Sequence, residues 1–233
     1  MKALQVCARG FTASFRIPFA IAGVQVTCPV PTYGTLLGFI SCCAGRLITP
    51  KDTRIGFEFT SSCKAQDLER IIRWDYNPKT PGMAKLNDKG PGIRQREFLV
   101  EPQITLFVSN LSLKESFLHP RGIPVLGRSQ DLVRIDSVEE IELIPVKKGS
   151  VGGTLLPFRV FKDKDIPGLV FKVPEYMEYD SSIRLREPRK NEMFIATSTD
   201  GRSRTEIQHD TNLFKYPNSM DPTACIYLHD WLD

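Results

Sequence analysis

The side chains of this chain that most clearly indicate a function are those of lysine and arginine, and they are concentrated in residues 77–97. Between Lys79 and Arg96 there are five cations and one anion, so the net charge of this stretch, +4, equals that of the whole chain. The cations are Lys79, Lys85, Lys89, Arg94 and Arg96. Three prolines and three glycines disfavour a helix or a regular strand here. Because apolar runs at 68–74 and 98–108 flank the segment, we predict two strands that carry a long basic arm suited to a polyanion. A solvated surface loop is the alternative.

Further arginines, interleaved with aromatic residues, also indicate a polyanion. They surround the expected first helix and a glycine-containing turn, and they are Arg9, Arg16, Arg46, Arg54, Arg121, Arg128 and Arg134. The aromatic residues are Phe11, Phe15, Phe19, Tyr33, Trp74 and Tyr76. Aromatic side chains beside a basic track hold single-stranded nucleic acid by stacking on its bases. For Arg128 the alternative is a salt bridge to Asp131 or Asp136.

The other chemistry-bearing residues form no recognisable catalytic or metal-binding pattern. The histidines, His119, His209 and His229, have no partner at a diagnostic spacing. The sequence has no GxSxG, HExxH, GxGxxG or Walker motif. Its six cysteines form no CxxC pair and no zinc spacing. The acidic residues of 136–142 alternate with apolar ones, as on a solvated strand face. We therefore expect no metal and no cofactor.

Composition places the chain among mildly basic globular proteins. Its 233 residues are 41% hydrophobic and 25% charged, and its pI is about 8.7. Any surface for nucleic acid must therefore be local. The sequence has no apolar run of about 18 residues that could span a bilayer, and no signal peptide is recognisable at its start. We expect a cytoplasmic protein with reduced cysteines and no membrane contact.

Hydrophobic periodicity predicts the elements that position these residues. Alternation indicates strands at 1–9, 54–60 and 138–144, with two more at 68–75 and 98–108 on either side of the arm.

Two helices are expected between these strands. Thr32 caps the first, whose apolar stripe continues to Leu47. Its N-terminus could supply backbone N–H groups to a phosphate. Gly34 and Gly38, one turn apart, imply the close approach of another backbone, a packed strand in preference to a ligand. Ser112-Leu-Lys-Glu115 is a capping box, which predicts a short second helix ending at Leu118.

This order predicts an α+β fold in two parts. Residues 1–150 form a ferredoxin-like (RRM-like) domain of the split β-α-β type, with the basic arm inserted as a hairpin, or thumb, at about 75–97. Residues 151–233 form an irregular β-rich lobe, with short β-type runs at 158–161, 169–173, 193–196 and 226–228. The glycine-rich residues 149–153 lack the Lys-Ser/Thr of a phosphate loop and are interpreted as a linker or turn.

Three segments together resemble one protein family. Residues 1–16, 30–38 and 125–132 are similar to the CRISPR-associated "Cas-five" subunits of type I Cascade, which belong to the repeat-associated (RAMP) superfamily. The I-B-like branch is the most similar. The basic arm falls where that family has its thumb, and the resemblance covers about residues 1–145.

The resemblance implies a subunit that binds the 5′ handle of the CRISPR RNA (crRNA) and caps the guide-RNA filament. Its implied partners are the Cascade backbone subunits and the large subunit, with target DNA indirectly, and it would not be an independent homo-oligomer. Motif matching places handle contacts on Phe11, Ser14, Arg16, Tyr33, Gly34, Thr35, Gly127, Arg128 and Ser129. It places thumb contacts on Lys85, Lys89, Arg94 and Arg96.

Two alternatives remain beside a non-catalytic RNA-binding subunit. Family members of I-C systems cleave precursor crRNA with a Tyr/Lys/His type of site. Tyr33, Lys114 and His119 are present here, but at an unfamiliar spacing, so a metal-independent endoribonuclease is the less favoured function. The other alternative is a structural scaffold without RNA contact, whose arm docks on an acidic protein.

Overall fold

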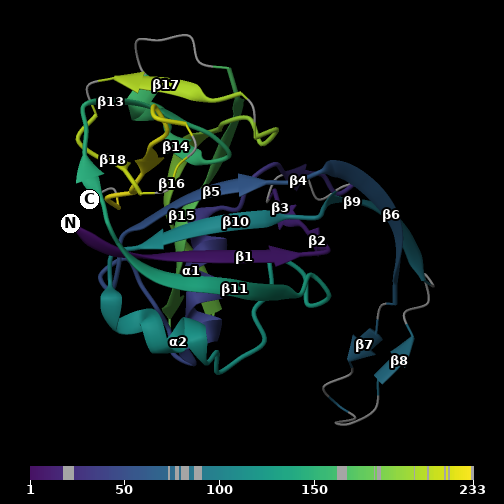
Figure 1. The fold of residues 1–233 in the computed structure, drawn as a ribbon. Helices are drawn as coiled ribbons and strands as arrows, with labels where there is room; N and C mark the ends of the chain where they lie inside the picture. Colours follow the sequence, from purple (N-terminus) through teal and green to yellow (C-terminus); the bar gives the residue numbers. More distant parts are fainter. Residues whose placement is uncertain are drawn as a thin grey trace.

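A four-stranded antiparallel sheet organises the first half of the chain (Figure 1). The computed structural model describes residues 1–17, 24–72, 74–76, 79, 84–86, 91–161, 167–180, 182, 185–201, 203–208, 210–217, 219 and 221–231. The sheet has the order β11-β1-β10-β5. In chain order its elements are β1 (Lys2–Gly10), α1 (Tyr33–Ala44), β5 (Ile55–Thr60), β10 (Gln103–Val108), α2 (Lys114–Leu118) and β11 (Val133–Glu142). The chain is mostly β with few helices, consistent with the predicted α+β class.

Both faces of the sheet carry buried residues. Leu4 and Val6 of β1 belong to the main core, together with Leu36 and Ile40 of α1. Ala3, which points to the opposite face, packs in a separate cluster with Phe107, Ile141 and parts of the C-terminal lobe. The C-terminal lobe therefore covers part of the face that α1 leaves open.

Helix α1 begins where the sequence predicts and ends earlier. The Thr32 side chain accepts a hydrogen bond from the Thr35 N–H at 3.3 Å, so Thr32 is the N-cap. Gly45 ends the helix in the left-handed conformation, with φ of 66°. Leu47, predicted to continue the apolar stripe, lies beyond the helix and is 53% exposed.

The predicted capping box before α2 is wrong. Ser112 lies inside a 3₁₀ turn, η1 (Leu111–Leu113), and the Asn110 side chain caps that turn by accepting from the Ser112 N–H at 3.0 Å. Helix α2 follows directly from the turn, and its N-cap residue makes no side-chain hydrogen bond.

A two-stranded arm extends from the body (Figure 1). Its stalk pairs β6 (Cys63–Ile71) with β9 (Gly92–Val100). Farther out, β7 (Trp74–Tyr76) pairs with β8 (Ala84–Leu86). The paired ribbon thus begins before the predicted residue 75. The predicted strand 98–108 is two strands, β9 and β10, because the chain bends at Glu101, which has φ of 49°, and at Pro102.

The remaining strands are short, apart from one long hairpin. Strands β2 (Thr12–Ala13) and β3 (Phe15–Arg16) follow β1; β2 pairs with β9 at the base of the arm, and β3 pairs with β4 (Thr27–Cys28). The hairpin consists of β15 (Leu169–Asp180) and β16 (Leu185–Ala196). The other elements are β12 (Ile144–Pro145), β13 (Lys148–Val151), β14 (Leu155–Pro157), the 3₁₀ helix η2 (Phe158–Phe161), β17 (Thr205–Gln208), β18 (Leu213–Lys215) and β19 (Ile226–Tyr227).

Two sequence predictions for this lobe are corrected. Residues 158–161 form a 3₁₀ helix instead of a strand, and β14 ends at Pro157. Residues 148–151, interpreted in part as a linker, form β13, which pairs with β17.

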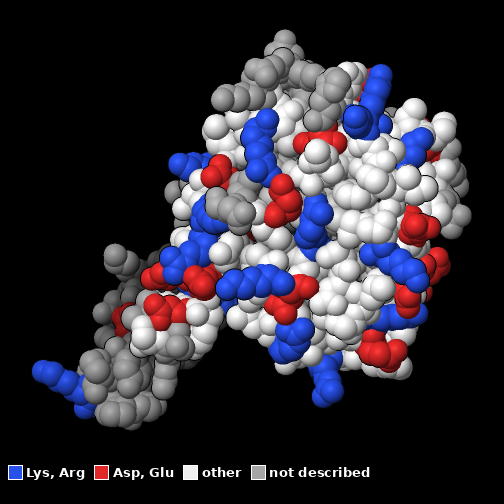
Figure 2. All heavy atoms as spheres, turned by 90° about the vertical axis from the view of Figure 1, so that its left-hand side faces the viewer, with Lys and Arg blue, Asp and Glu red and all other residues white. Residues whose placement is uncertain are grey.

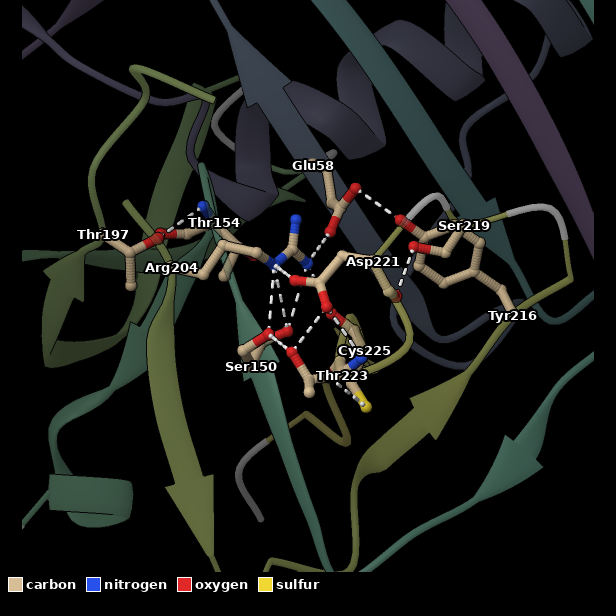
Figure 3. Close-up of polar contacts among 10 residues, drawn as sticks. All are labelled: Glu58, Ser150, Thr154, Thr197, Arg204, Tyr216, Ser219, Asp221, Thr223 and Cys225. Atoms are coloured by element: carbon tan, nitrogen blue, oxygen red, sulfur yellow. Dashed lines mark hydrogen bonds and ion pairs between the residues drawn. The ribbon is translucent and has the colours of Figure 1, made fainter. Parts of the chain in front are cut away.

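A polar network joins the C-terminal lobe to the first sheet (Figure 3). The Arg204 guanidinium forms an ion pair with Glu58 of β5 and donates to the Ser150 carbonyl at 3.1 Å. The second oxygen of Glu58 accepts from the Tyr216 hydroxyl at 2.8 Å. Both Arg204 and Glu58 are about four-fifths buried. One carboxylate of the sheet thus anchors two separate segments of the lobe.

Candidate nucleic-acid interface

A cleft of about 500 Å³ lies where the base of the arm, helix α1 and the loop before β11 meet. We call it the basic cleft. Seven of the thirteen RNA-contact residues predicted from the sequence line it: Ser14, Arg16, Gly34, Thr35, Arg96, Gly127 and Arg128. These residues come from four segments that are far apart in the chain. The fold therefore gathers into one surface what the sequence shows only as separate motifs.

Backbone contacts hold the walls of the cleft together. The Ser14 N–H donates to the Leu126 carbonyl at 3.1 Å. Gly127 has φ of 114°, and a Cβ there would lie 1.9 Å from the Ser14 carbonyl oxygen. Gly127 is thus required by the approach of Ser14, a contact within the chain. On the other wall, Gln25 exchanges backbone hydrogen bonds with Gln95 and Glu97, on either side of Arg96.

The four arginines of the cleft differ in how their charge is compensated. Arg16 and Arg186 are exposed, and neither has an acidic partner among the residues that the structure describes. Arg128 pairs with Asp131, and Arg96 pairs with Glu69. Arg96 is 9% exposed, and within the described chain its Nε has no hydrogen-bond partner. The cleft therefore combines two uncompensated cations with a buried, unused donor, a combination that favours an anionic ligand.

The start of helix α1 adds to this positive potential. Gly34 and Thr35 occupy its first turn and line the cleft. The Thr35 N–H donates to the Thr32 side chain, and the partial positive charge of the helix start favours a phosphate nearby.

Arg128 forms a salt bridge to Asp131, which was the alternative interpretation of the sequence. Its Nε lies 3.0 Å from Oδ2 of Asp131, and its Nη2 lies 2.9 Å from Oδ1. The guanidinium also lies over the Phe98 ring, 5.5 Å from the centroid. The fork that was predicted to contact RNA is therefore occupied by a carboxylate of the chain itself.

Tyr33, which was predicted to contact RNA, is buried in the core. Its side chain is 1% exposed, and its hydroxyl donates to the Leu155 carbonyl at 2.6 Å. The ring stacks on His229, with centroids 4.0 Å apart. Burial, the largest effect, raises the pKa of Tyr33 well above its ordinary value of 10. This side chain belongs to the core and is not accessible to RNA.

The other predicted contact residues lie outside the lining of the cleft. Phe11 is 88% exposed between β1 and β2, and Ser129 is exposed in the turn after Arg128. Arg94 lies on the arm, opposite Glu69. Lys85 belongs to β8, but its side chain is not described, and Lys89 lies outside the described residues.

The residues considered for RNA cleavage have separate environments. Lys114 donates to Glu140 at 2.8 Å, which raises the pKa of Lys114 and lowers that of Glu140. The His119 side chain is 81% exposed, with Glu115 at 4.0 Å, while Tyr33 is buried. Within the described part of the chain, no group of three or more His, Cys, Asp or Glu residues is placed to hold a metal ion. The described helices are also too short or too polar to cross a membrane.

Sequence reasoning missed Gln25 and Arg186, which also line the cleft. Arg186 comes from the hairpin of the C-terminal lobe, and no local signal connects it with helix α1. On the face shown in Figure 2, basic and acidic side chains are interspersed. This face therefore shows no extended basic patch.

Comparison with solved structures shows a similar fold in a chain of a CRISPR complex. A chain of a CRISPR RNA-guided surveillance complex is similar over 84% of this chain and 90% of that chain, with 16% identity and a TM-score of 0.53. A CRISPR protein from Archaeoglobus fulgidus has 12% identity, a TM-score of 0.47 and coverage of 98% of this chain and 100% of that chain. A chain of the type III-B Cmr-beta complex bound to cognate target RNA has 10% identity, a TM-score of 0.49 and coverage of 88% and 86%.

The fold likeness rests on the first of these structures. No family model matches the sequence, and no curated protein matches it.

Proposed function

We propose that this chain is a non-catalytic subunit of a type I CRISPR Cascade surveillance complex. It binds the 5′ handle of crRNA in the basic cleft and caps the guide-RNA filament. Its partners are the backbone and large subunits of that complex. The observation that carries the proposal is the convergence of seven predicted contact residues on one cleft, where Arg16 and Arg186 have no acidic partner among the described residues.

The topology supports a RAMP-type assignment. The order β-α-β-β-α-β and the sheet order β11-β1-β10-β5 match the split β-α-β plan of ferredoxin-like domains. The arm inserted between β5 and β10 corresponds in position to the thumb of the "Cas-five" family. The similar chain of known structure comes from a CRISPR RNA-guided surveillance complex, which agrees with a role in such a complex.

The salt dependence of RNA binding tests this function. Each lysine or arginine that contacts a phosphate of single-stranded RNA contributes about 0.7 to the slope of log K against log salt. The variant Arg16→Ala/Arg186→Ala should therefore reduce the slope by about 1.4 in titrations of crRNA with the full chain. Lys148→Ala, on β13 of the C-terminal lobe, removes a surface cation and is the charge control.

Two outcomes would contradict the proposal. One is an equal slope for the wild type and the double variant. The other is binding to the assembled backbone subunits that does not change when the 5′ handle is removed from the guide. The second result would favour a scaffold without contact to the handle.

A further inference from the structure

A second hollow, of about 670 Å³, lies on helix α1 next to the basic cleft. Its floor is the exposed face of α1 around Gly38. One wall is the segment 45–51 after the helix, and the other wall is the outer half of the β15–β16 hairpin, including Met177 and Tyr179. We call this hollow the α1 groove.

The basic cleft and the α1 groove meet over the helix. Gly34, Gly38, Cys42 and Arg186 line both of them. An extended ligand that lies in the cleft can therefore continue across α1 into the groove, and Gly38 marks the crossing point.

The two glycines of α1 have different surroundings. A Cβ on Gly34 would lie 3.7 Å from the Tyr176 Cα, an ordinary van der Waals distance, so Gly34 lies against strand β15. A Cβ on Gly38 would meet no atom within 4 Å. Glycine inside a helix is less favourable than alanine, yet nothing in the described chain uses the space at Gly38. A side chain there would stand in the passage between the two hollows.

The wall of the groove combines an aromatic ring with cations. Tyr179 is 49% exposed and lies directly opposite Arg186 in the β15–β16 register, so both side chains project from one face of the hairpin. Lys51 is exposed on the opposite wall, and the described residues give neither Lys51 nor Arg186 an acidic partner. Glu178, the acidic residue on this wall, forms an ion pair with Arg189.

We propose that the α1 groove binds the continuation of a single-stranded RNA from the basic cleft. The strand crosses α1 at Gly38, one base stacks on Tyr179, and its phosphates lie near Arg186 and Lys51. An exposed aromatic ring beside cations is the arrangement that holds single strands without reading their sequence. The inference rests on the proposed RNA-binding function and gives the C-terminal lobe a part in it.

The test uses the full chain and labelled single-stranded RNAs of about four and about ten nucleotides. Gly38→Leu and Tyr179→Ala should each weaken binding of the longer RNA about tenfold, as expected for a lost stacking contact. Tyr179→Ala should leave binding of the shorter RNA, which the cleft alone can hold, within about twofold; because Gly38 lines the cleft as well, Gly38→Leu is scored on the longer RNA only. Gly38→Leu should not lower the melting temperature, because its side chain enters open space. Phe158→Ala, which removes an exposed ring outside both hollows, is the aromatic control.

RNA that contains 4-thiouridine gives a second readout, and we expect adducts on the peptide that contains Tyr179. If Arg16→Ala weakens binding while both groove variants bind the longer RNA like the wild type, the groove proposal is overturned and the RNA-binding function stands. If the wild type binds neither RNA, both proposals fail. If the groove variants change only the association with a protein subunit, the groove is a protein-docking site and the proposal is wrong.

Discussion

Arg128 and Asp131 form a bidentate ion pair beside the basic cleft. Asp131 is 0% exposed, and each of its oxygens accepts from the Arg128 guanidinium. Oδ2 also accepts from the Arg128 backbone N–H at 2.9 Å, and Oδ1 accepts from the Thr12 hydroxyl at 2.6 Å. The pair fixes the loop before β11 against the strand that follows β1, and so it sets the shape of the cleft wall.

The first prediction concerns this pair. Asp131→Ala should lower the free energy of unfolding by about 3–5 kcal/mol, because it leaves a largely buried arginine without its counter-charge. Arg128→Lys should have a smaller effect, about 1–2 kcal/mol, because lysine keeps the charge but loses the planar fork. Urea unfolding measures both values. Equal stability of Asp131→Ala and the wild type would show that the pair contributes nothing to the fold.

The junction between the lobes gives the second prediction. Glu58→Ala should lower the free energy of unfolding by about 2–3 kcal/mol, because Arg204 and the Tyr216 hydroxyl both lose a partly buried acceptor. Glu58→Gln keeps one acceptor oxygen and should have a smaller effect. Glu206→Ala, which removes a surface partner of Lys148, should change stability by less than about 1 kcal/mol. A Glu58→Ala effect no larger than this control would contradict the prediction.

Local patterns were sufficient to predict the first helix and the central strand. Thr32 is a strong N-cap, and the alternation of β1 requires Leu4 and Val6 to share one face. The inward position of Tyr33 depends on His229, at the other end of the sequence, so no local pattern could reveal it. The place of Arg186 in the cleft depends on the packing of β15 against Gly34, which is also a long-range contact.

The sequence identified the cations of the site, but it did not show which of them are free to bind phosphate. Arg96 and Arg128 were predicted as RNA contacts from their charge and their surroundings in the sequence. Their acidic partners are Glu69, on the paired strand of the arm, and Asp131, three residues away, which the sequence analysis kept as an alternative. Whether a cation is free to bind phosphate depends on strand register and turn geometry, which charge patterns do not specify.

The third prediction is a pH dependence caused by His229. This residue is 0% exposed, and its Nε2 lies 2.6 Å from Oε1 of Glu175. Burial lowers the pKa of His229 from 6.5, and the opposing effect of Glu175 is smaller. The unfolded state therefore binds this proton more readily than the folded state. The resulting stability is fully present above about pH 6.5 and decreases as the pH falls below it.

His229→Gln isolates this contribution, because glutamine can donate to Glu175 but does not titrate. The free energy of unfolding of the wild type should fall more steeply than that of the variant between pH 7 and pH 5, by at most about 1.4 kcal/mol per pH unit. Urea titrations across this range measure both curves. Parallel curves would mean that His229 has similar pKa values in the folded and unfolded states.

The fourth prediction separates the cations of the arm. Arg96 is paired with Glu69, and Arg94 lies opposite Glu69 in the register, so these two are partly compensated. Lys85→Gln/Lys89→Gln should therefore reduce the salt slope of crRNA binding by about 1.4, at about 0.7 for each cation. Arg94→Gln/Arg96→Gln should change the slope less and lower the stability of the arm. A larger slope change from the arginine pair than from the lysine pair would show that the ion pairs open when RNA binds.

The last prediction is that the chain does not cleave precursor crRNA. A metal-independent ribonuclease needs a base and a cation close to the attacking 2′-hydroxyl. Here the Tyr33 hydroxyl is buried and donates to the Leu155 carbonyl, Lys114 is held by Glu140, and the His119 side chain is exposed on the short helix α2. Incubation of the purified chain with repeat RNA in EDTA should therefore leave the RNA intact, while an added metal-independent ribonuclease cleaves it under the same conditions. Discrete cleavage that disappears in His119→Ala would overturn the non-catalytic assignment, because it would show that His119 meets its catalytic partners only when the RNA is bound.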